Sequence, residues 1–351
     1  MMASNRFSNL LARGAALLIA FSFAVLARKS TAQPAVLERP QANQANEAEA
    51  DSPGSTWLRI DEDKQGKPLA LQTAIVRYVP EAEKARVTRG GTPSRYVDLV
   101  SAIHIGDKAY YDTLNSRFEK YEAVLYELVA DKGTKVPKGR GTSNTNPLGA
   151  LQNGMGSLLE LEHQLEQIDY TKKNFIHADL SPEELWQTMR DRDESLLKMY
   201  MDMLKAAEAQ RVKKQKAKAK KGEGDFTSKL LEIASNALPA GLQVSEAEVD
   251  IVKAFMSDDR ARGLKVALAK QFLDVEAITA VLSGPDGSTL ISGRNKRALD
   301  VLETQLAAGK EKLAIFYGAG HYPDMHERLE KRFKLVPVSV EWVDTWDLRE
   351  K

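Results

Sequence analysis

The five histidines are the first side chains to examine for chemistry, because the chain contains no cysteine. Without thiols, a disulfide framework, a thiolate nucleophile, an Fe–S cluster and a cysteine zinc site are all excluded. The histidines stand at positions 104, 163, 177, 321 and 326. An imidazole can act as a general base near neutral pH or bind a divalent metal ion.

Two of the histidines occur in the same local setting. The segments 101–104 (SAIH) and 318–321 (GAGH) each follow an apolar run and place a small residue three positions before the histidine. A small residue at a strand end lets a ligand or another backbone segment approach closely. We expect His104 and His321 to stand on loops above the carboxyl ends of two strands, where open α/β sheets bind ligands.

Glu127 and Arg294 are candidates for the same edge of the sheet. Glu127 lies in the apolar segment 123–129, where a carboxylate is costly to bury unless it is paired or bound to a metal. Arg294 opens the helix that leads to the last strands. The alternatives are an edge carboxylate that reaches solvent for Glu127 and a surface ion pair for Arg294.

His177 and Asp179 form a further candidate pair just before Ser181. In an extended segment, this spacing points both side chains the same way, so they could be extra ligands or substrate contacts. We favour a structural interpretation, in which Asp179 is a turn residue and His177 is an interhelical hydrogen-bond partner.

The elements that must position these residues follow an α/β pattern. Strands are predicted over 69–79, 95–105 and 123–129, with a helix over 110–121. A helical stretch follows over about 158–281, in which Ser181 and Ser245 begin capping boxes. Helices over 298–308 and 325–332 then alternate with strands over 313–317 and 335–343. We predict an α/β fold in which two strand-helix-strand halves form one central sheet, with a large helical insertion, about 157–283, between them.

The N-terminal region has the layout of an export signal. Arg6 and Arg13 precede an uncharged apolar run over 14–27, and small residues follow before Gln33. Residues 1–32 are therefore interpreted as a signal peptide, or alternatively as an N-terminal anchor, and 33–55 as a disordered linker. The domain proper is 56–351. We expect an exported protein, periplasmic or extracytoplasmic, that meets a membrane only through its N-terminal segment.

Composition and charge limit the class of partner. Of 351 residues, 43% are hydrophobic and 28% are charged, which is ordinary for a soluble domain, and the net charge is +1. A near-zero net charge provides no general attraction for nucleic acid. The basic run 211–221 could be a patch for nucleic acid or anionic lipid, but we favour the solvated end of a long helix, because no aromatic residue interrupts it.

The motifs, taken together and in order, resemble those of the TraB/GumN family, which includes the Tiki proteins and has the erythromycin esterases as distant relatives. The resemblance covers about 95–131 and 290–342, with His104, Glu127, Arg294 and His321 on the family's motif positions. Ser101 departs from the pattern, since the family prefers glycine there. Asp112 is a second departure, at a position where proline is common.

The resemblance implies a hydrolase whose catalytic residues are His104, Glu127, His321 and Arg294. It implies metal-dependent peptidase chemistry, as in Tiki, with His104, Glu127 and His321 as ligands of a divalent Mn, Co or Zn ion. Two imidazoles and a carboxylate leave a coordination position open for water. The alternatives are a metal-independent, esterase-like hydrolase, in which Glu127 orients a histidine base, and a non-catalytic peptide-binding protein.

Peptides or small-molecule esters are the expected substrates. No P-loop, GxGxxG, HExxH or GxSxG motif occurs, so nucleotide-binding, zincin and serine-hydrolase assignments lack support. We likewise expect no haem.

Overall fold

The computed structural model describes residues 52–139, 159–195, 250–251, 254, 257–282 and 287–350. In this part of the chain, seven strands form one mixed sheet, in the order β1-β2-β3-β8-β5-β7, and β9 also pairs with β2. The strands of this sheet are β1 (Leu58–Glu62), β2 (Pro68–Pro80), β3 (Tyr96–Ala102), β5 (Ala123–Tyr126), β7 (Phe175–His177), β8 (Lys312–Gly318) and β9 (Leu335–Asp347). A separate two-stranded sheet consists of β4 (Ile105–Gly106) and β6 (Glu162–His163).

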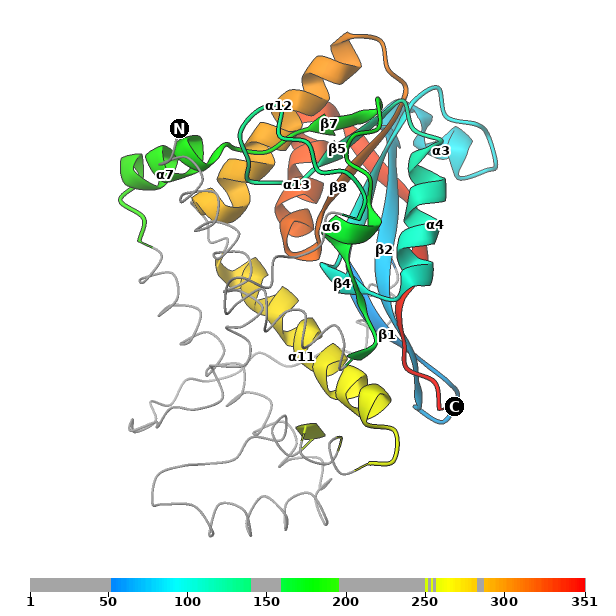
Figure 1. Cartoon of the computed structure of the whole chain (residues 1–351). Coiled ribbons are helices and arrows are strands. Elements are labelled where there is room, and N and C mark those ends of the chain that lie inside the picture. Colours follow the sequence, from blue (N-terminus) through cyan, green and yellow to red (C-terminus); the bar gives the residue numbers. More distant parts are fainter. Residues whose placement is uncertain are drawn as a thin grey trace, which may run out of the picture.

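Helices cover both faces of the main sheet (Figure 1). The longer α-helices are α4 (Lys108–Phe118), α7 (Pro182–Asp191), α11 (Arg260–Leu282), α12 (Arg294–Ala307) and α13 (Tyr322–Phe333). Short elements are α3 (Lys84–Val87), α6 (Gln164–Gln167), the 3-10 helices η2 (Glu81–Glu83) and η4 (Ala319–His321), and the π-helix η3 (Thr289–Gly293). None of the helices in these ranges has the length and apolar character that crossing a membrane requires.

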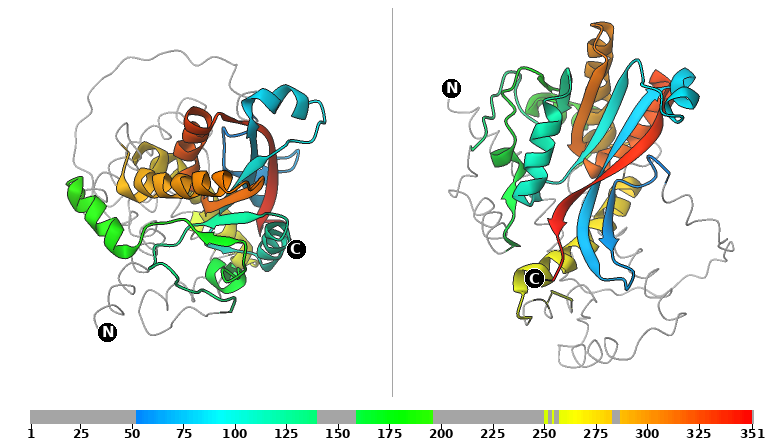
Figure 2. Two further views of the ribbon diagram at one scale, coloured as in Figure 1. Left: turned by 90° about the horizontal axis from the view of Figure 1, so that it is seen from above. Right: turned by 90° about the vertical axis from the view of Figure 1, so that its right-hand side faces the viewer.

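The alternation of apolar side chains along β3 explains the layers. Val97 and Leu99 pack into the core cluster that contains the apolar residues of α12 and α13, whereas Val100 and Ala102 pack into the cluster that contains those of α4. Successive side chains of a strand point to opposite faces, so β3 is buried from both sides. The two views in Figure 2 show α12 and α13 on one face and α4 on the other.

Four neighbouring strands run parallel in the middle of the sheet. β3 pairs with β8, β8 with β5, and β5 with β7, all in the parallel sense. Their carboxyl ends therefore share one edge. β2 is antiparallel to both β3 and β9, and β9 extends along the side of β2 that faces away from β3.

The predicted α/β class with a central sheet is confirmed, and each of the predicted strands is present within a few residues of its expected bounds. The capping box at Ser181 is also confirmed, since its Oγ accepts from Glu184 N and the Glu184 carboxylate accepts from Ser181 N. The range 157–283 differs from its helical prediction, because Phe175–His177 forms β7 and completes the parallel set.

Three expectations lie outside the described residues. These are the signal peptide or anchor over 1–32 with nearly all of the linker over 33–55, the capping box at Ser245, and the basic run over 211–221.

Candidate functional site

An ionisable side chain follows each of the four parallel strands at their common carboxyl edge. His104 stands two residues after β3, His321 three after β8, Glu127 directly after β5, and Asp179 two after β7. Arg294 begins α12 and reaches the same edge through its hydrogen bonds. The fold thus brings five residues from distant segments to the part of an α/β sheet where ligands bind.

Glu127 is the centre of this cluster. Its Oε1 accepts a 2.7 Å hydrogen bond from Arg294 Nη2, and its Oε2 accepts a 2.7 Å bond from the backbone N–H of Gly318. Burial raises the pKa of Glu127, but Arg294, His321 and His104 outweigh it and hold that pKa well below its ordinary value. The carboxylate is therefore ionised at neutral pH, although its side chain is only 14% exposed.

Arg294 forms a buried ion pair with Asp179. Its Nε donates to Oδ1 at 2.9 Å and its Nη2 to Oδ2 at 2.6 Å, and the Asp179 side chain is fully buried. Burial lowers the pKa of Arg294, but the two carboxylates Asp179 and Glu127 raise it well above its ordinary value. The surface ion pair considered for Arg294 is thus replaced by a bidentate pair inside the protein, the stronger kind of arginine–carboxylate contact.

A π-helical turn delivers Arg294 to this position. The π-helix η3 runs directly into α12, and Ser288 caps it by accepting a hydrogen bond from the backbone N–H of Ile291 at 3.3 Å. The carboxylate of Glu194 accepts from the backbone N–H of Thr289 at 3.0 Å. π-helical turns are rare and frequently occur at functional sites.

Asn295 fixes the ring of His321. Its amide nitrogen donates to His321 O at 2.9 Å and to Asp324 Oδ2 at 2.8 Å, so its Oδ1 must be the atom 2.6 Å from His321 Nδ1. An amide oxygen only accepts, and the hydrogen-bond network therefore assigns the proton to Nδ1. The ring of Tyr317 packs edge-on against the imidazole, with the centroids 5.1 Å apart.

The other ring nitrogen of His321 faces Glu127. Nε2 lies 3.6 Å from Oε1, which is longer than a hydrogen bond. With only Nδ1 protonated, a lone pair on Nε2 would face a carboxylate oxygen, so the contact is favourable when a positive charge, either a second ring proton or a metal cation, lies between the two atoms.

His104 stands apart from this contact at the same edge. Its side chain is exposed, and its carbonyl oxygen accepts a 2.9 Å hydrogen bond from the backbone N–H of Gln164, which ties the loop to α6. It is close enough to contribute to the lowered pKa of Glu127. Among the residues that the structure describes, no three His, Asp or Glu side chains are arranged to hold a metal ion.

Two of the three expected ligands nevertheless fit a divalent metal. The 3.6 Å between Nε2 of His321 and Oε1 of Glu127 is close to the roughly 3.4 Å that separates two ligand atoms of a tetrahedral ion with bonds of about 2.1 Å. The Asn295 hydrogen bond on Nδ1 is the kind of outer contact that orients metal-binding histidines.

Comparison of the chain with known protein families, curated proteins and solved structures returns no match. The geometry of the site therefore carries the functional argument.

Asp179 was considered as an extra ligand or substrate contact, but the favoured interpretation made it a turn residue, whereas the structure makes it the buried partner of Arg294. His177 does have a structural role, as favoured, but its partner is not on a helix: its Nε2 lies 2.6 Å from the carbonyl oxygen of Leu128. One signal for Asp179 was available, since an aspartate just after a short apolar segment is typical of a strand end in an α/β sheet.

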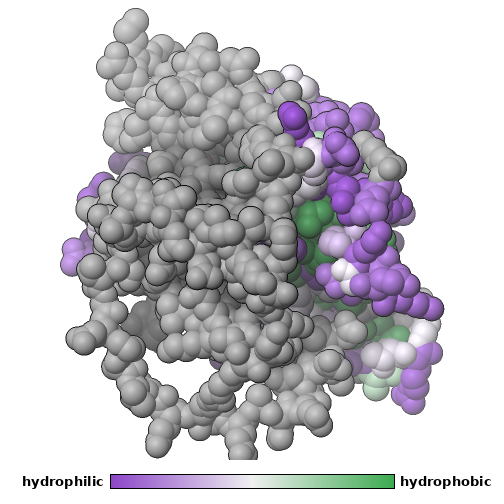
Figure 3. Space-filling view, turned by 90° about the horizontal axis from the view of Figure 1, so that it is seen from below, coloured by the Kyte–Doolittle hydropathy of each residue, from purple (hydrophilic) through white to green (hydrophobic). Residues whose placement is uncertain are grey.

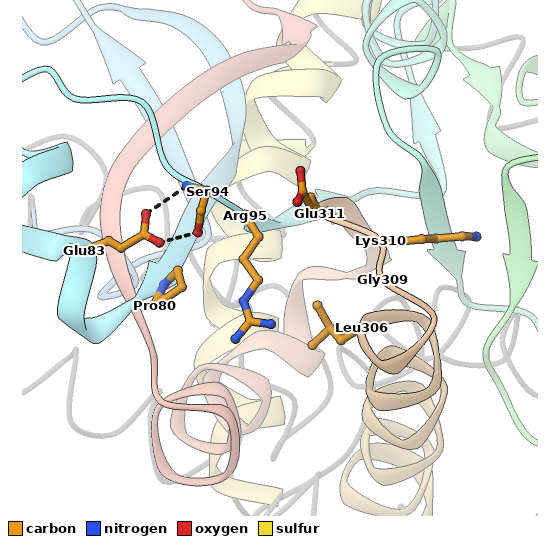
Figure 4. Close-up of a pocket in the computed structure, with 8 residues that line it drawn as sticks. All are labelled: Pro80, Glu83, Ser94, Arg95, Leu306, Gly309, Lys310 and Glu311. Carbon is orange, nitrogen blue, oxygen red and sulfur yellow. Dashed lines mark hydrogen bonds between the residues drawn. The ribbon is translucent and has the colours of Figure 1, made fainter.

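Two of the cavities in the part of the chain that the structure describes differ in their position relative to the cluster. One, of about 380 Å³, is at the opposite, amino-terminal edge of β3 and β8, between Pro80, Arg95 and Leu306. Figure 4 shows Glu83 bonded to Ser94 there and Lys310 directed away from Arg95, so no set of groups converges on one point. The second cavity, of about 370 Å³, borders the cluster itself.

Proposed function

We propose that the chain is an exported hydrolase of the TraB/GumN type, with metal-dependent, peptidase-like chemistry at His104, Glu127 and His321. The observation that carries the proposal is the pair formed by His321 Nε2 and Glu127 Oε1. These two atoms face each other at 3.6 Å, and the ring is held by Asn295. Two opposed acceptors favour a site that a cation completes.

In this proposal, His321 and Glu127 hold a divalent Mn, Co or Zn ion, and the exposed His104 is the third ligand. Such an ion, when bound, lowers the pKa of a water molecule so that hydroxide forms near neutral pH. One lone pair of Glu127 Oε1 is used by Arg294, which leaves another for the ion.

Arg294 has a second role toward the substrate. Its Nε and Nη2 are used by Asp179 and Glu127, and no described residue accepts a hydrogen bond from Nη1. Nη1 is therefore available to donate to the oxygen that becomes negative when water adds to a carbonyl group. Asp179 fixes the guanidinium plane and so positions that donor without touching the substrate.

The metal-independent, esterase-like alternative has less support. It requires Glu127 to accept a hydrogen bond from one ring N–H of His321, while the other nitrogen acts as the base. Both ring nitrogens already face acceptors, Asn295 Oδ1 and Glu127 Oε1. His104 would then be the remaining base.

The proposal is tested by incubating the purified chain with a peptide library and a set of small esters, with chelator and with added Mn²⁺, Co²⁺ or Zn²⁺. We expect peptide cleavage that chelator abolishes and metal restores, and that Glu127→Gln lacks. Ester cleavage indifferent to chelator would favour the alternative. Peptide binding without turnover would favour a non-catalytic binding protein.

Two further parts of the proposal concern the rest of the chain. We propose that the strand-helix-strand segments around β3–β5 and β8–β9 are the two halves of one domain, with residues between them inserted. We also propose that residues 1–32 direct export and that the domain acts outside the cytoplasm.

A further inference from the structure

The cavity that borders the cluster has basic walls. It measures about 370 Å³ and is lined by Arg192, Lys296, Arg297 and Arg328, with Asp300 as the one carboxylate in the lining. These side chains come from α12, from α13 and from the residue after α7. Cavities of this size accommodate small ligands or single groups of larger ones.

Internal ion pairs leave part of this positive charge unused. Arg192 donates to Glu194 at 2.6 Å, Arg297 to Glu184 at 2.6 Å, and Arg328 from Nε to Asp324 at 2.7 Å. Lys296 is exposed and forms no ion pair with another described residue. No described acceptor bonds to Nη1 or Nη2 of Arg328, so this guanidinium keeps two donor groups for a ligand.

The single carboxylate in the lining does not neutralise this excess. Asp300 is already engaged by Arg332, whose Nη1 donates to it at 2.8 Å. An anion entering the cavity therefore meets cationic side chains and no uncompensated negative charge.

The cavity is connected to the catalytic cluster by hydrogen bonds. Arg328 donates to Oδ2 of Asp324, the same oxygen accepts from Asn295 at 2.8 Å, and Asn295 holds His321 Nδ1. Two lining residues are neighbours of the cluster along the chain. Leu180 directly follows Asp179, and Gly293 directly precedes Arg294. A substrate with its carbonyl group at the cluster thus has its next groups within reach of the cavity.

We infer that this cavity binds a carboxylate of the substrate, the C-terminal carboxylate of a peptide in the first instance. The inference rests on the proposed hydrolase function and specifies its substrate class. Arginine matches a carboxylate by donating two parallel hydrogen bonds, and Lys296 adds a mobile charge at the rim.

The experiment measures binding in the full chain carrying Glu127→Gln, which removes turnover. Tetrapeptides of mixed sequence are prepared once with free C-termini and once as amides, and the retained peptides are quantified by mass spectrometry. We expect retention of the acids to exceed that of the amides about tenfold, as loss of a charge-assisted contact would give. Adding Lys296→Glu should abolish most of this preference.

The matched control is Lys310→Glu, at a partly exposed lysine of the cavity on the opposite edge, and it should keep the preference. Equal retention of acids and amides, no retention of either, or equal effects of the two lysine variants would overturn the inference. If inorganic phosphate competed but the free acids did not bind, the carboxylate assignment would also be wrong. A clear acid preference in a chain that hydrolyses nothing would support the cavity assignment and contradict the proposed function alone.

Discussion

Arg294 donates to both carboxylate oxygens of Asp179, at 2.9 and 2.6 Å, and the Asp179 side chain is fully buried. The same Nη2 group reaches Glu127 at 2.7 Å. One guanidinium thus holds two carboxylates that come from the ends of neighbouring strands, and the following predictions depend on that arrangement.

Asp179→Asn should be strongly destabilising. The substitution keeps the shape but leaves Arg294 in a buried site with one carboxylate partner, and breaking a buried pair costs about 3–5 kcal/mol. Denaturant unfolding measures the change in the free energy of unfolding. Asp300→Asn is the control, because its pair with Arg332 is half exposed and worth less than about 1 kcal/mol. Equal, small losses in both variants would contradict a buried pair.

Glu127→Gln should change the pH dependence of stability. Because the pKa of Glu127 is lowered in the folded state, its ionised form contributes stability above the unfolded pKa of about 4.3, and this is lost as the pH falls through the lower folded value. The stability difference between wild type and variant should therefore shrink below about pH 4.3. Unfolding curves over this range test it, with the exposed Glu119→Gln as control. A difference that stays constant on acidification would argue against the lowered pKa.

Substitution of the histidines by alanine should distinguish those needed for activity from the one with a structural role. We expect His104→Ala and His321→Ala to lose turnover and metal binding. His177→Ala should retain both and lose about 1 kcal/mol of stability, because only its bond to the Leu128 carbonyl is removed. Activity assays, metal analysis and denaturant unfolding read out the three variants. Abolished turnover in a stable His177→Ala protein would extend the site to β7.

The tautomer of His321 is directly observable. ¹⁵N NMR of the imidazole should show a proton on Nδ1, because Asn295 offers only its oxygen there. Addition of Zn²⁺ should shift the Nε2 resonance and leave Nδ1 protonated. In Asn295→Leu, the ring proton should no longer prefer Nδ1 over Nε2. His326, whose Nδ1 lies 2.7 Å from the Tyr78 hydroxyl, serves as the internal reference. A stable Nε2–H that zinc does not displace would count against the metal site.

Export is tested by the N-terminus of the mature protein. The apolar run over 14–27 and the small residues after it predict cleavage close to Gln33. Mass spectrometry of protein recovered from outside the cytoplasm should find that terminus. An intact Met1 on cytoplasmic protein would refute the prediction.

The sequence was sufficient to locate His104, Glu127 and His321 because each follows an apolar run long enough to be recognised as a strand. Glu127 was especially visible, since a carboxylate in such a run requires a partner. Arg294 was placed at the same edge of the sheet, but its hydrogen bond to Glu127 became apparent only from the fold.

Asp179 and Asn295 were beyond such reasoning for two physical reasons. Asp179 follows β7, a strand of three residues that is too short to show an alternating pattern. Its partner Arg294 is 115 positions away, so the local sequence around Asp179 does not identify that partner. The role of Asn295 depends on both amide hydrogens being used, which only coordinates reveal.

The surface contributes one further observation. Seen from below, the described surface is mostly hydrophilic, with a smaller apolar area between the polar regions (Figure 3). This distribution is ordinary for a folded domain, and we assign no partner to it.

The position of β8 has a consequence for biosynthesis. This strand lies between β3 and β5 but begins 210 residues after the end of β3 and 186 after the end of β5, and it carries the backbone group that binds Glu127. A nascent chain that has not reached residue 318 cannot join the strands that bear His104 and Glu127. The cluster of His104, Glu127 and His321 can therefore assemble only when nearly the whole polypeptide has been synthesised.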